Sequence, residues 1–181
     1  EGSYLGIPME NRKVSLQVSD VVVKTSVQYT GADLLTTDSI ITINKTRRVN
    51  NDIYEVDTKG WNRTIQKDTV ETVTEIVDAA QYNVSYTKNN FGTFSLAPIN
   101  VTQKELTEDM ISIVGDYTYT GEEISPEIVV KYNDMTLTQT GDSGLGDYEI
   151  IEVKDSLAVG KGTVTIEATG RNYSGEASKT F

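Results

Sequence analysis

Short runs of alternating apolar and polar residues recur along most of the chain. The clearest are VVVKTSVQY, SIITINK, YNVSYT, TFSLAPINV, EIVVKY, YEIIEV and TVTIEA. They are rich in Val, Ile, Thr and Tyr, and Gly, Asn or Asp usually lies between them, a pattern typical of strands joined by turns. In TVTIEA, Val164, Ile166 and Ala168 share one face, while Thr165 and Glu167 point to the other. This alternation predicts an antiparallel sheet that is buried on one face.

Helical patterns are sparse. KELTEDMIS is short, and DTVETVTEIVDAA, which begins at Asp68, is the better candidate. Its apolar residues have helical spacing: Val70, Val73, Ile76 and Val77. Its many β-branched residues nevertheless weaken the tendency to form a helix. We therefore predict an all-β chain, with a helix over 68–80 as an open alternative.

One phrase occurs twice in the sequence. QYTGADLLTTDSIITI begins at Gln28 and YTYTGEEISPEIVV begins at Tyr117, and each leads from Tyr-Thr-Gly into a β-branched strand. Further on, Tyr82 aligns with Tyr148, and Gly92-Thr93 aligns with Gly162-Thr163. This internal repeat predicts two related β modules in tandem.

The two modules are expected over residues 12–103 and 104–181. The first is longer because of residues near 44–81, which we interpret as an insertion into one loop of a shared scaffold. The join, PINVTQKEL, has no Gly-rich linker and predicts a semi-rigid pair. Two small immunoglobulin-like β-sandwiches fit this pattern best. β-Grasp-like modules are the alternative, and they require a helix packed across the sheet.

The second module resembles a repeat found in large surface proteins of Gram-positive bacteria. The residues that carry the resemblance are Tyr119-Thr120-Gly121, Ile124-Ser125-Pro126, Asp147-Tyr148, Gly162-Thr163, Asn172-Tyr173-Ser174-Gly175 and Phe181. The first module departs from the pattern, since Gln81 replaces the Asp and the Pro and Asn-Tyr-x-Gly are absent. The resemblance implies small immunoglobulin-like or β-grasp-like domains strung along wall-attached adhesins and stalks. It implies no ligand.

Composition excludes several classes of function. The net charge is −11, which disfavours nucleic acid and anionic membranes as partners. The apolar runs are too short to predict insertion into a membrane. The chain contains no Cys and no His, so it lacks thiol nucleophiles, the commonest general base and the usual transition-metal ligands. We therefore expect neither catalysis nor a cofactor.

The motif GDSGLG, Gly141 to Gly146, is similar to the nucleophile segment of serine proteases. That chemistry requires a histidine to accept the serine proton, and the residue types are those of a turn, so we predict a hairpin loop. Asp142 and Asp147 offer a weak calcium site as an alternative, although their spacing is not that of an EF-hand loop.

The segment DIYEVDTKGWNR holds the only tryptophan, Trp61, with Tyr54 and Arg63 close by in sequence. An exposed Trp beside Arg can stack on a sugar or anchor a protein. The competing interpretation is that Trp61 fills the space between the insertion and the sandwich.

These observations predict a non-catalytic, extracellular pair of modules from a bacterial cell-surface protein, monomeric within a longer chain and anchored to the cell wall or surface outside this sequence. Its role would be that of a semi-rigid stalk or adhesion scaffold. The alternative is a module that binds a glycan or an extracellular host protein through the region around Trp61, Tyr54 and Arg63.

Overall fold

The computed structural model describes residues 12–181 and confirms the prediction of an all-β chain. The described chain divides into a first unit, residues 12–27 with Ala32–Val101, and a second unit, Gln28–Gly31 with Thr102–Phe181. The division into domains 12–103 and 104–181 stays a prediction, because contacts do not show that either part folds by itself. Within residues 12–181 no helix has the length and apolar character needed to cross a membrane.

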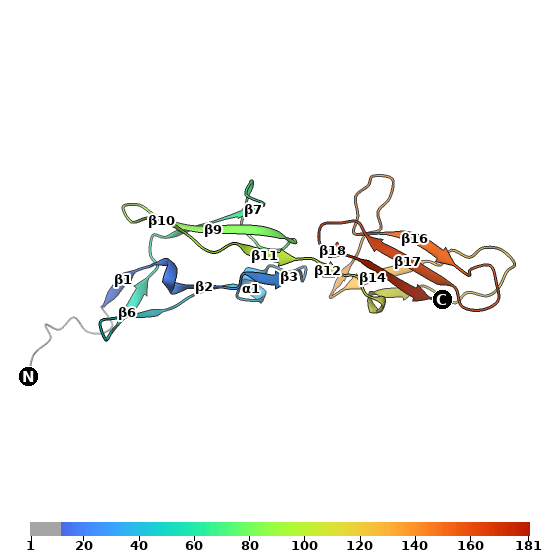
Figure 1. The fold of residues 1–181 in the computed structure, drawn as a ribbon, viewed down its shortest axis with the longest axis horizontal. Helices are drawn as coiled ribbons and strands as arrows, with labels where there is room; N and C mark the ends of the chain where they lie inside the picture. Colours follow the sequence, from blue (N-terminus) through green and yellow to red (C-terminus); the bar gives the residue numbers. More distant parts are fainter. Residues whose placement is uncertain (1–11) are drawn as a thin grey trace, which may run out of the picture. The chain divides into compact units, whose positions relative to one another are not determined.

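The largest sheet of the first unit is built around the long strand β9 (Ala80–Lys88), drawn in green in Figure 1. Its other members are β7 (Asn62–Lys67) and β8 (Glu71–Val73) on one side, and β10 (Gly92–Ser95), β11 (Ile99–Thr102) and β3 (Ser26–Gln28) on the other. Tyr82, Val84 and Tyr86 are buried on one face of β9, as the alternation in YNVSYT predicts.

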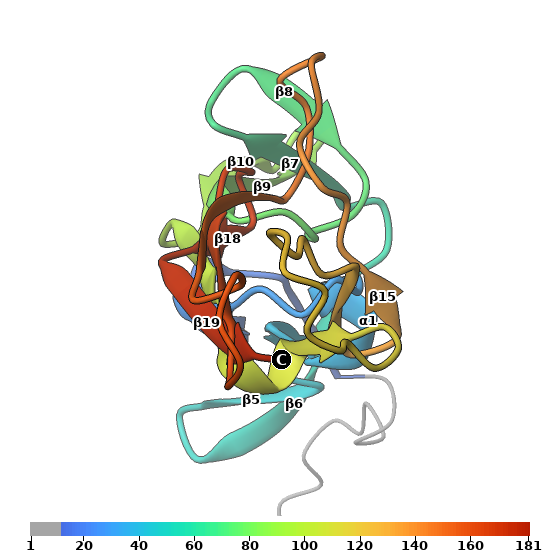
Figure 2. The ribbon, with the colours of Figure 1, turned by 90° about the vertical axis from the view of Figure 1, so that its right-hand side faces the viewer.

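A second layer of the first unit consists of shorter strands. These are β1 (Lys13–Ser15), which runs parallel to β6 (Asp52–Asp57), β5 (Thr46–Val49), which pairs with β6, and the antiparallel pair β2 (Val21–Val23) and β4 (Ile41–Ile43). Figure 2 shows the hairpin of β5 and β6 on the side of this unit away from β7 and β8. Leu16, Ile40 and Val56 are buried in this layer, so both layers contribute to an apolar core, as in a β-sandwich.

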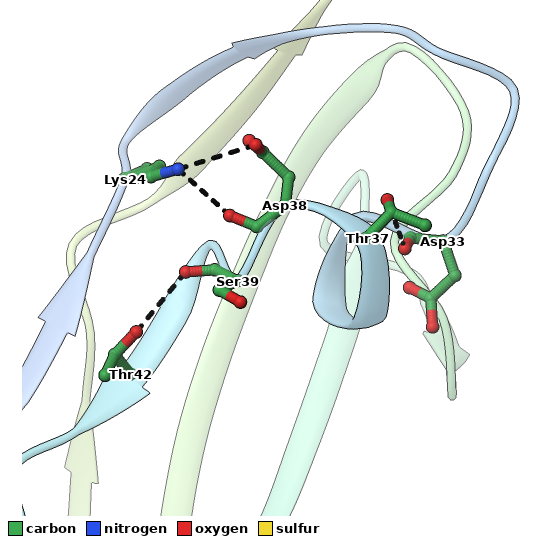
Figure 3. A network of polar contacts seen from close by, with 6 residues as sticks. All are labelled: Lys24, Asp33, Thr37, Asp38, Ser39 and Thr42. Atoms are coloured by element: carbon green, nitrogen blue, oxygen red, sulfur yellow. Dashed lines mark hydrogen bonds and ion pairs between the residues drawn. The ribbon is translucent and has the colours of Figure 1, made fainter.

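A polar network fixes the connection between β3 and β4 (Figure 3). It surrounds α1 (Leu34–Thr37), a single turn whose N-cap is Asp33. The Asp33 carboxylate accepts hydrogen bonds from the backbone N–H of Leu35 and of Ile76, each at 3.1 Å. Lys24 Nζ donates to the backbone oxygen of Asp38 at 2.9 Å, and its ammonium lies 3.5 Å from the Asp38 carboxylate. This turn is therefore held both by its cap and by a distant part of the first unit.

The segment 44–81 is built into the sheets and does more than extend one loop. It supplies β5, β6, β7 and β8, and β7 pairs along its whole length with β9. The helix considered over 68–80 does not form. Glu71–Val73 is strand β8, and Ile76 is fully buried. Only Ile76 of its apolar residues is buried, while Val73 and Val77 are half-buried and Val70 is 83% exposed. The α-helix α1, with four residues, is the only one in 12–181, so the helix that β-grasp modules require is not seen there.

The second unit has two three-stranded sheets. One contains β13 (Ile111–Ile113), β14 (Ile128–Tyr132) and β15 (Met135–Thr136), and the other contains β16 (Tyr148–Lys154), β17 (Thr163–Ala168) and β19 (Glu176–Thr180). A short parallel pair, β12 (Lys104–Glu105) and β18 (Tyr173–Ser174), completes the unit. Val130 from one sheet and Val164 and Ile166 from the other are fully buried. KELTEDMIS forms β12, a 3-10 turn at Glu108–Met110 and the start of β13, so it is not an α-helix.

Candidate functional site

Trp61 is partly buried and lies just before β7, at one end of the large sheet of the first unit. Its ring packs on Phe94, with centroids 5.3 Å apart, and on Phe91, at 6.3 Å. Phe94 in turn stacks on Tyr86 of β9 at 5.4 Å. Trp61 therefore ends a row of aromatic rings that begins in the core and reaches the surface.

An open groove of about 440 Å³ runs beside this row. It is lined by Ser15–Ser19 on one side and by Trp61, Phe91, Thr93 and Phe94 on the other. Phe91 is 58% exposed. It lies in the tight turn between β9 and β10, where Asn90 and Gly92 have positive φ, and Lys88 Nζ lies 4.3 Å from the centre of its ring. The groove thus combines an exposed aromatic face with a nearby cation.

The indole nitrogen of Trp61 is buried and has no hydrogen-bond partner among the described residues. A buried donor without a partner costs about 1–3 kcal/mol. Such groups are rare in folded proteins, where a bound water or ligand commonly accepts the hydrogen bond. The Trp61 indole N–H is therefore a polar group that the described fold leaves unsatisfied.

Tyr54 and Arg63 do not join Trp61 in one site. Tyr54 lies on β6, opposite Arg47 of β5, in the small sheet. Arg63 is exposed on β7, opposite Tyr86, and is not part of the groove lining. Closeness in sequence misleads for Tyr54, because the chain turns between β6 and β7 and these strands join different sheets.

Phe91 and Phe94 are the groove residues that the sequence reasoning missed. The signal available for them was NNFGTF, whose Asn-Asn and Gly mark a turn between two strands. A hairpin there places one Phe in the turn and the other two or three residues away, on β10. Nothing local, however, identifies Trp61 as their neighbour.

Arg47, one member of the adjacent pair Arg47-Arg48, is used inside the fold. Its guanidinium lies 2.6 Å from the carboxylate of Asp20, which is 2% exposed. The same carboxylate oxygen accepts the backbone N–H of Gln17 at 2.9 Å, and Arg47 also donates to the backbone oxygen of Ser15 at 3.3 Å. This buried pair ties β5 to the Ser15–Ser19 segment that lines the groove.

The suggested calcium ligands have different roles. Asp142 is exposed in a loop, whereas the Asp147 carboxylate accepts the backbone N–H of Thr138 at 2.9 Å. Across residues 12–181, no three or more His, Cys, Asp or Glu side chains are grouped so that they could hold a metal ion. Asp147 therefore has a structural contact that accounts for its position.

GDSGLG forms a turn, as its composition predicts, but the prediction of a hairpin loop is wrong, because β15 and β16 on either side of it belong to different sheets. Gly144 has φ of 69° and donates to the backbone oxygen of Gly141 at 2.9 Å, and the Ser143 hydroxyl accepts the backbone N–H of Leu145 at 3.3 Å. A Cβ on Gly146 would lie 2.6 Å from backbone atoms of Thr140, so only glycine fits there. The resemblance to a protease motif is explained by these turn requirements.

The second unit contains a cluster of three tyrosines. Tyr29 packs edge-on against Tyr173, with centroids 5.5 Å apart, and lies 6.4 Å from Tyr132. Tyr173 is 3% exposed, and burial, with a smaller contribution from Tyr29, raises its pKa well above the ordinary value. The Tyr173 ring therefore packs in the core of the second unit.

No protein-family model, curated protein or solved structure matches this chain. A function for it therefore rests on its own residues and their geometry.

Proposed function

We propose that the chain is a non-catalytic pair of β modules that acts as a stalk or adhesion scaffold in a bacterial cell-surface protein, outside the cell. The resemblance of the second module to surface-protein repeats suggests the setting. The residues that carry this resemblance serve packing and turns: Tyr148 and Tyr173 are each 3% exposed, and Asp147 caps a backbone N–H. Motifs used in this way favour a structural role over a ligand site.

One observation carries the stalk proposal, the parallel pairing of β12 with β18. Lys104 N–H donates to Asn172 O and Leu106 N–H donates to Ser174 O, both at 2.9 Å. After Gly175, β18 leads into β19, which runs on to the C-terminus (Figure 1). Lys179 on β19 also lies 3.3 Å from Glu108, just after β12. The strand that enters the unit is thus hydrogen-bonded to β18, which leads directly into the last strand, β19.

This arrangement suits a segment under tension. When two parallel strands are pulled from opposite ends, force acts along the strands and loads their hydrogen bonds together, whereas an antiparallel hairpin pulled at its open end loses its bonds one at a time. Tension that enters at Thr102 and leaves at Phe181 would therefore shear β12 against β18. Resistance to shear is what a load-bearing stalk requires.

Single-molecule pulling on the full chain tests this proposal. Lys104→Pro removes the N–H that bonds to Asn172, and Lys104→Ala is the matched control, because it removes the same side chain from Tyr132 and keeps the N–H. We expect the unfolding force of the second unit to fall in Lys104→Pro and to be kept in Lys104→Ala. Equal forces in all three proteins would contradict the shear arrangement.

A second candidate function is recognition of a glycan by the groove beside Trp61. The exposed ring of Phe91 favours it, since a sugar can stack on an aromatic face. Trp61 is the only tryptophan, so its fluorescence reports on this groove. We expect a glycan that binds to shift the emission and protect it from iodide, and Phe91→Ala to abolish both effects. Emission that is unchanged by a glycan array pool would exclude this function for the glycans tested.

A further inference from the structure

The structure reveals a second and more regular repeat than the one seen in the sequence. Residues 13–31 and 103–121 share three features in the same order, and the numbers of matching residues differ by 90: Val18 and Glu108 begin a 3-10 turn, Val21 and Ile111 begin a strand, and Tyr29 and Tyr119 begin Tyr-Thr-Gly. Strand β3, before Tyr29, has no strand as its counterpart before Tyr119. The two strands, β2 and β13, each pair antiparallel with a later strand. Both glycines of the phrase have positive φ, 85° for Gly31 and 80° for Gly121. The two phrases are therefore structural counterparts.

The first phrase is part of the second unit. Tyr29 is 6% exposed, with its ring against Tyr132 and Tyr173. The Tyr132 hydroxyl donates to Tyr29 O at 3.1 Å, and the Asn133 side chain donates to Thr30 O at 2.9 Å. These contacts use a tyrosine ring and two backbone oxygens. Any segment that reads Tyr-Thr-Gly in the same conformation can make them.

The second phrase has the same features without such neighbours. Tyr119 is 60% exposed, although its counterpart is buried. Tyr117, two residues earlier, is held against Phe181 with ring centroids 5.7 Å apart, and its hydroxyl accepts the N–H of Glu127 at 2.7 Å. The backbone before Tyr119 is thus anchored, and the exposed ring follows it.

We propose that Tyr119-Thr120-Gly121 inserts into a further β unit of the same kind, against a tyrosine pair equivalent to Tyr132 and Tyr173. The partner is defined by chemistry: two tyrosine rings that form a slot for a third, and an Asn side chain that donates to the carbonyl after it. In a tandem array, each unit would then receive one tyrosine from the module that precedes it. This inference rests on the proposed tandem scaffold, and it explains why the same phrase occurs twice.

The experiment adds a copy of residues 102–181 after Phe181 of the full chain. The added copy contains the tyrosine pair but has no Tyr29 of its own, so Tyr119 is the only counterpart in the module before it. Segmental labelling of the added copy with ¹⁵N lets amide exchange report on that copy alone. The variants are Tyr119→Ala, and Tyr119→Phe as the matched control that keeps the ring.

We expect amide exchange in the added copy to become about a hundredfold faster in Tyr119→Ala, as for loss of a large buried ring. Tyr119→Phe should differ from wild type by less than about threefold. In the chain without the added copy, Tyr119→Ala should leave exchange in the second unit unchanged, because the ring is exposed there.

Equal exchange rates in the added copy with Tyr, Phe or Ala at 119 would overturn the proposal. An added copy that stays unfolded with Tyr119 present would also overturn it, since Tyr119 should replace Tyr29. Neither result affects the pulling experiment on the β12–β18 pair, which needs no added copy. Failure of this inference and failure of the stalk proposal are therefore distinguishable.

Discussion

Replacement of Tyr29 by alanine should destabilise the second unit, although Tyr29 lies 73 residues before Thr102, where the rest of that unit begins. The ring is 6% exposed and contacts Tyr132 and Tyr173. Truncation of a large buried aromatic to alanine costs about 3–5 kcal/mol. The backbone oxygens of Tyr29 and Thr30 keep their donors, so we expect a value near the lower end, about 3 kcal/mol. A unit of about 80 residues has a free energy of unfolding of roughly 4–12 kcal/mol, so this loss is a large part of the total.

Two probes separate the units in the full chain. Trp61, the only tryptophan, lies in the first unit, and its fluorescence follows urea unfolding there. Amide exchange of β17, which is central in its sheet, follows the second unit. We expect exchange in β17 to rise by about two powers of ten, because 1.4 kcal/mol corresponds to a factor of ten. The midpoint seen by Trp61 should not change.

Tyr119→Ala is the matched control, since Tyr119 begins the same phrase and is 60% exposed. A change there should shift the free energy of unfolding by less than about 0.5 kcal/mol. The reasoning is refuted if Tyr29→Ala leaves exchange in β17 unchanged, or if both variants destabilise the second unit equally. Either result would mean that Tyr29 is not part of that core.

Three further predictions concern other parts of the fold. Arg47→Met leaves the buried carboxylate of Asp20 without its cation and should destabilise the first unit by about 3 kcal/mol. Urea unfolding followed by Trp61 fluorescence measures this loss. A loss below about 1 kcal/mol would show that the ion pair is not buried in solution. Gly146→Ala should lower the free energy of unfolding by about 1–3 kcal/mol, because its Cβ would lie 2.6 Å from backbone atoms of Thr140. An unchanged melting temperature in calorimetry would contradict this close contact. Burial raises the pKa of Tyr173, so above about pH 10 the unfolded phenol loses its proton first, and the free energy of unfolding should fall by about 1.4 kcal/mol per pH unit. Burial also raises the pKa of Tyr148, so Tyr173→Phe should reduce that slope and leave the part that Tyr148 contributes, and an unchanged slope would assign it to another group.

The strands were predictable because their pattern is local. In YNVSYT and TVTIEA, alternate residues are buried as the period of two requires. The same logic failed over 68–80, where helical spacing was produced by a strand, a turn and a separate buried residue, Ile76. The spacing of apolar residues predicts the secondary structure correctly only where a single helix or strand contains all of them.

Longer-range features depended on pairings that sequence alone does not specify. Tyr82 was aligned with Tyr148, yet Tyr82 lies on β9, with strands on both sides, whereas Tyr148 begins β16 at the end of its sheet order. Residues 44–81 looked like an insertion because they have no counterpart, but β7 became a full member of the large sheet. The partners of Trp61 are 30 and 33 residues away, as their numbers Phe91 and Phe94 show. Such contacts depend on which strands pair with one another, and the composition of the segments does not determine that pairing.

The two Tyr-Thr-Gly phrases separate what local sequence decides from what it does not. Each phrase has a glycine with similar positive φ, and each comes after a 3-10 turn and a strand at the same spacing. The local sequence therefore specifies a similar backbone conformation at both places. Burial of the tyrosine ring is not encoded in the phrase, because it depends on whether two other tyrosines lie within reach. Tyr29 has Tyr132 and Tyr173 beside it, while Tyr119 is mostly exposed. A free energy of about 3 kcal/mol for one ring and almost none for its counterpart would then measure the contribution of the two neighbouring tyrosines.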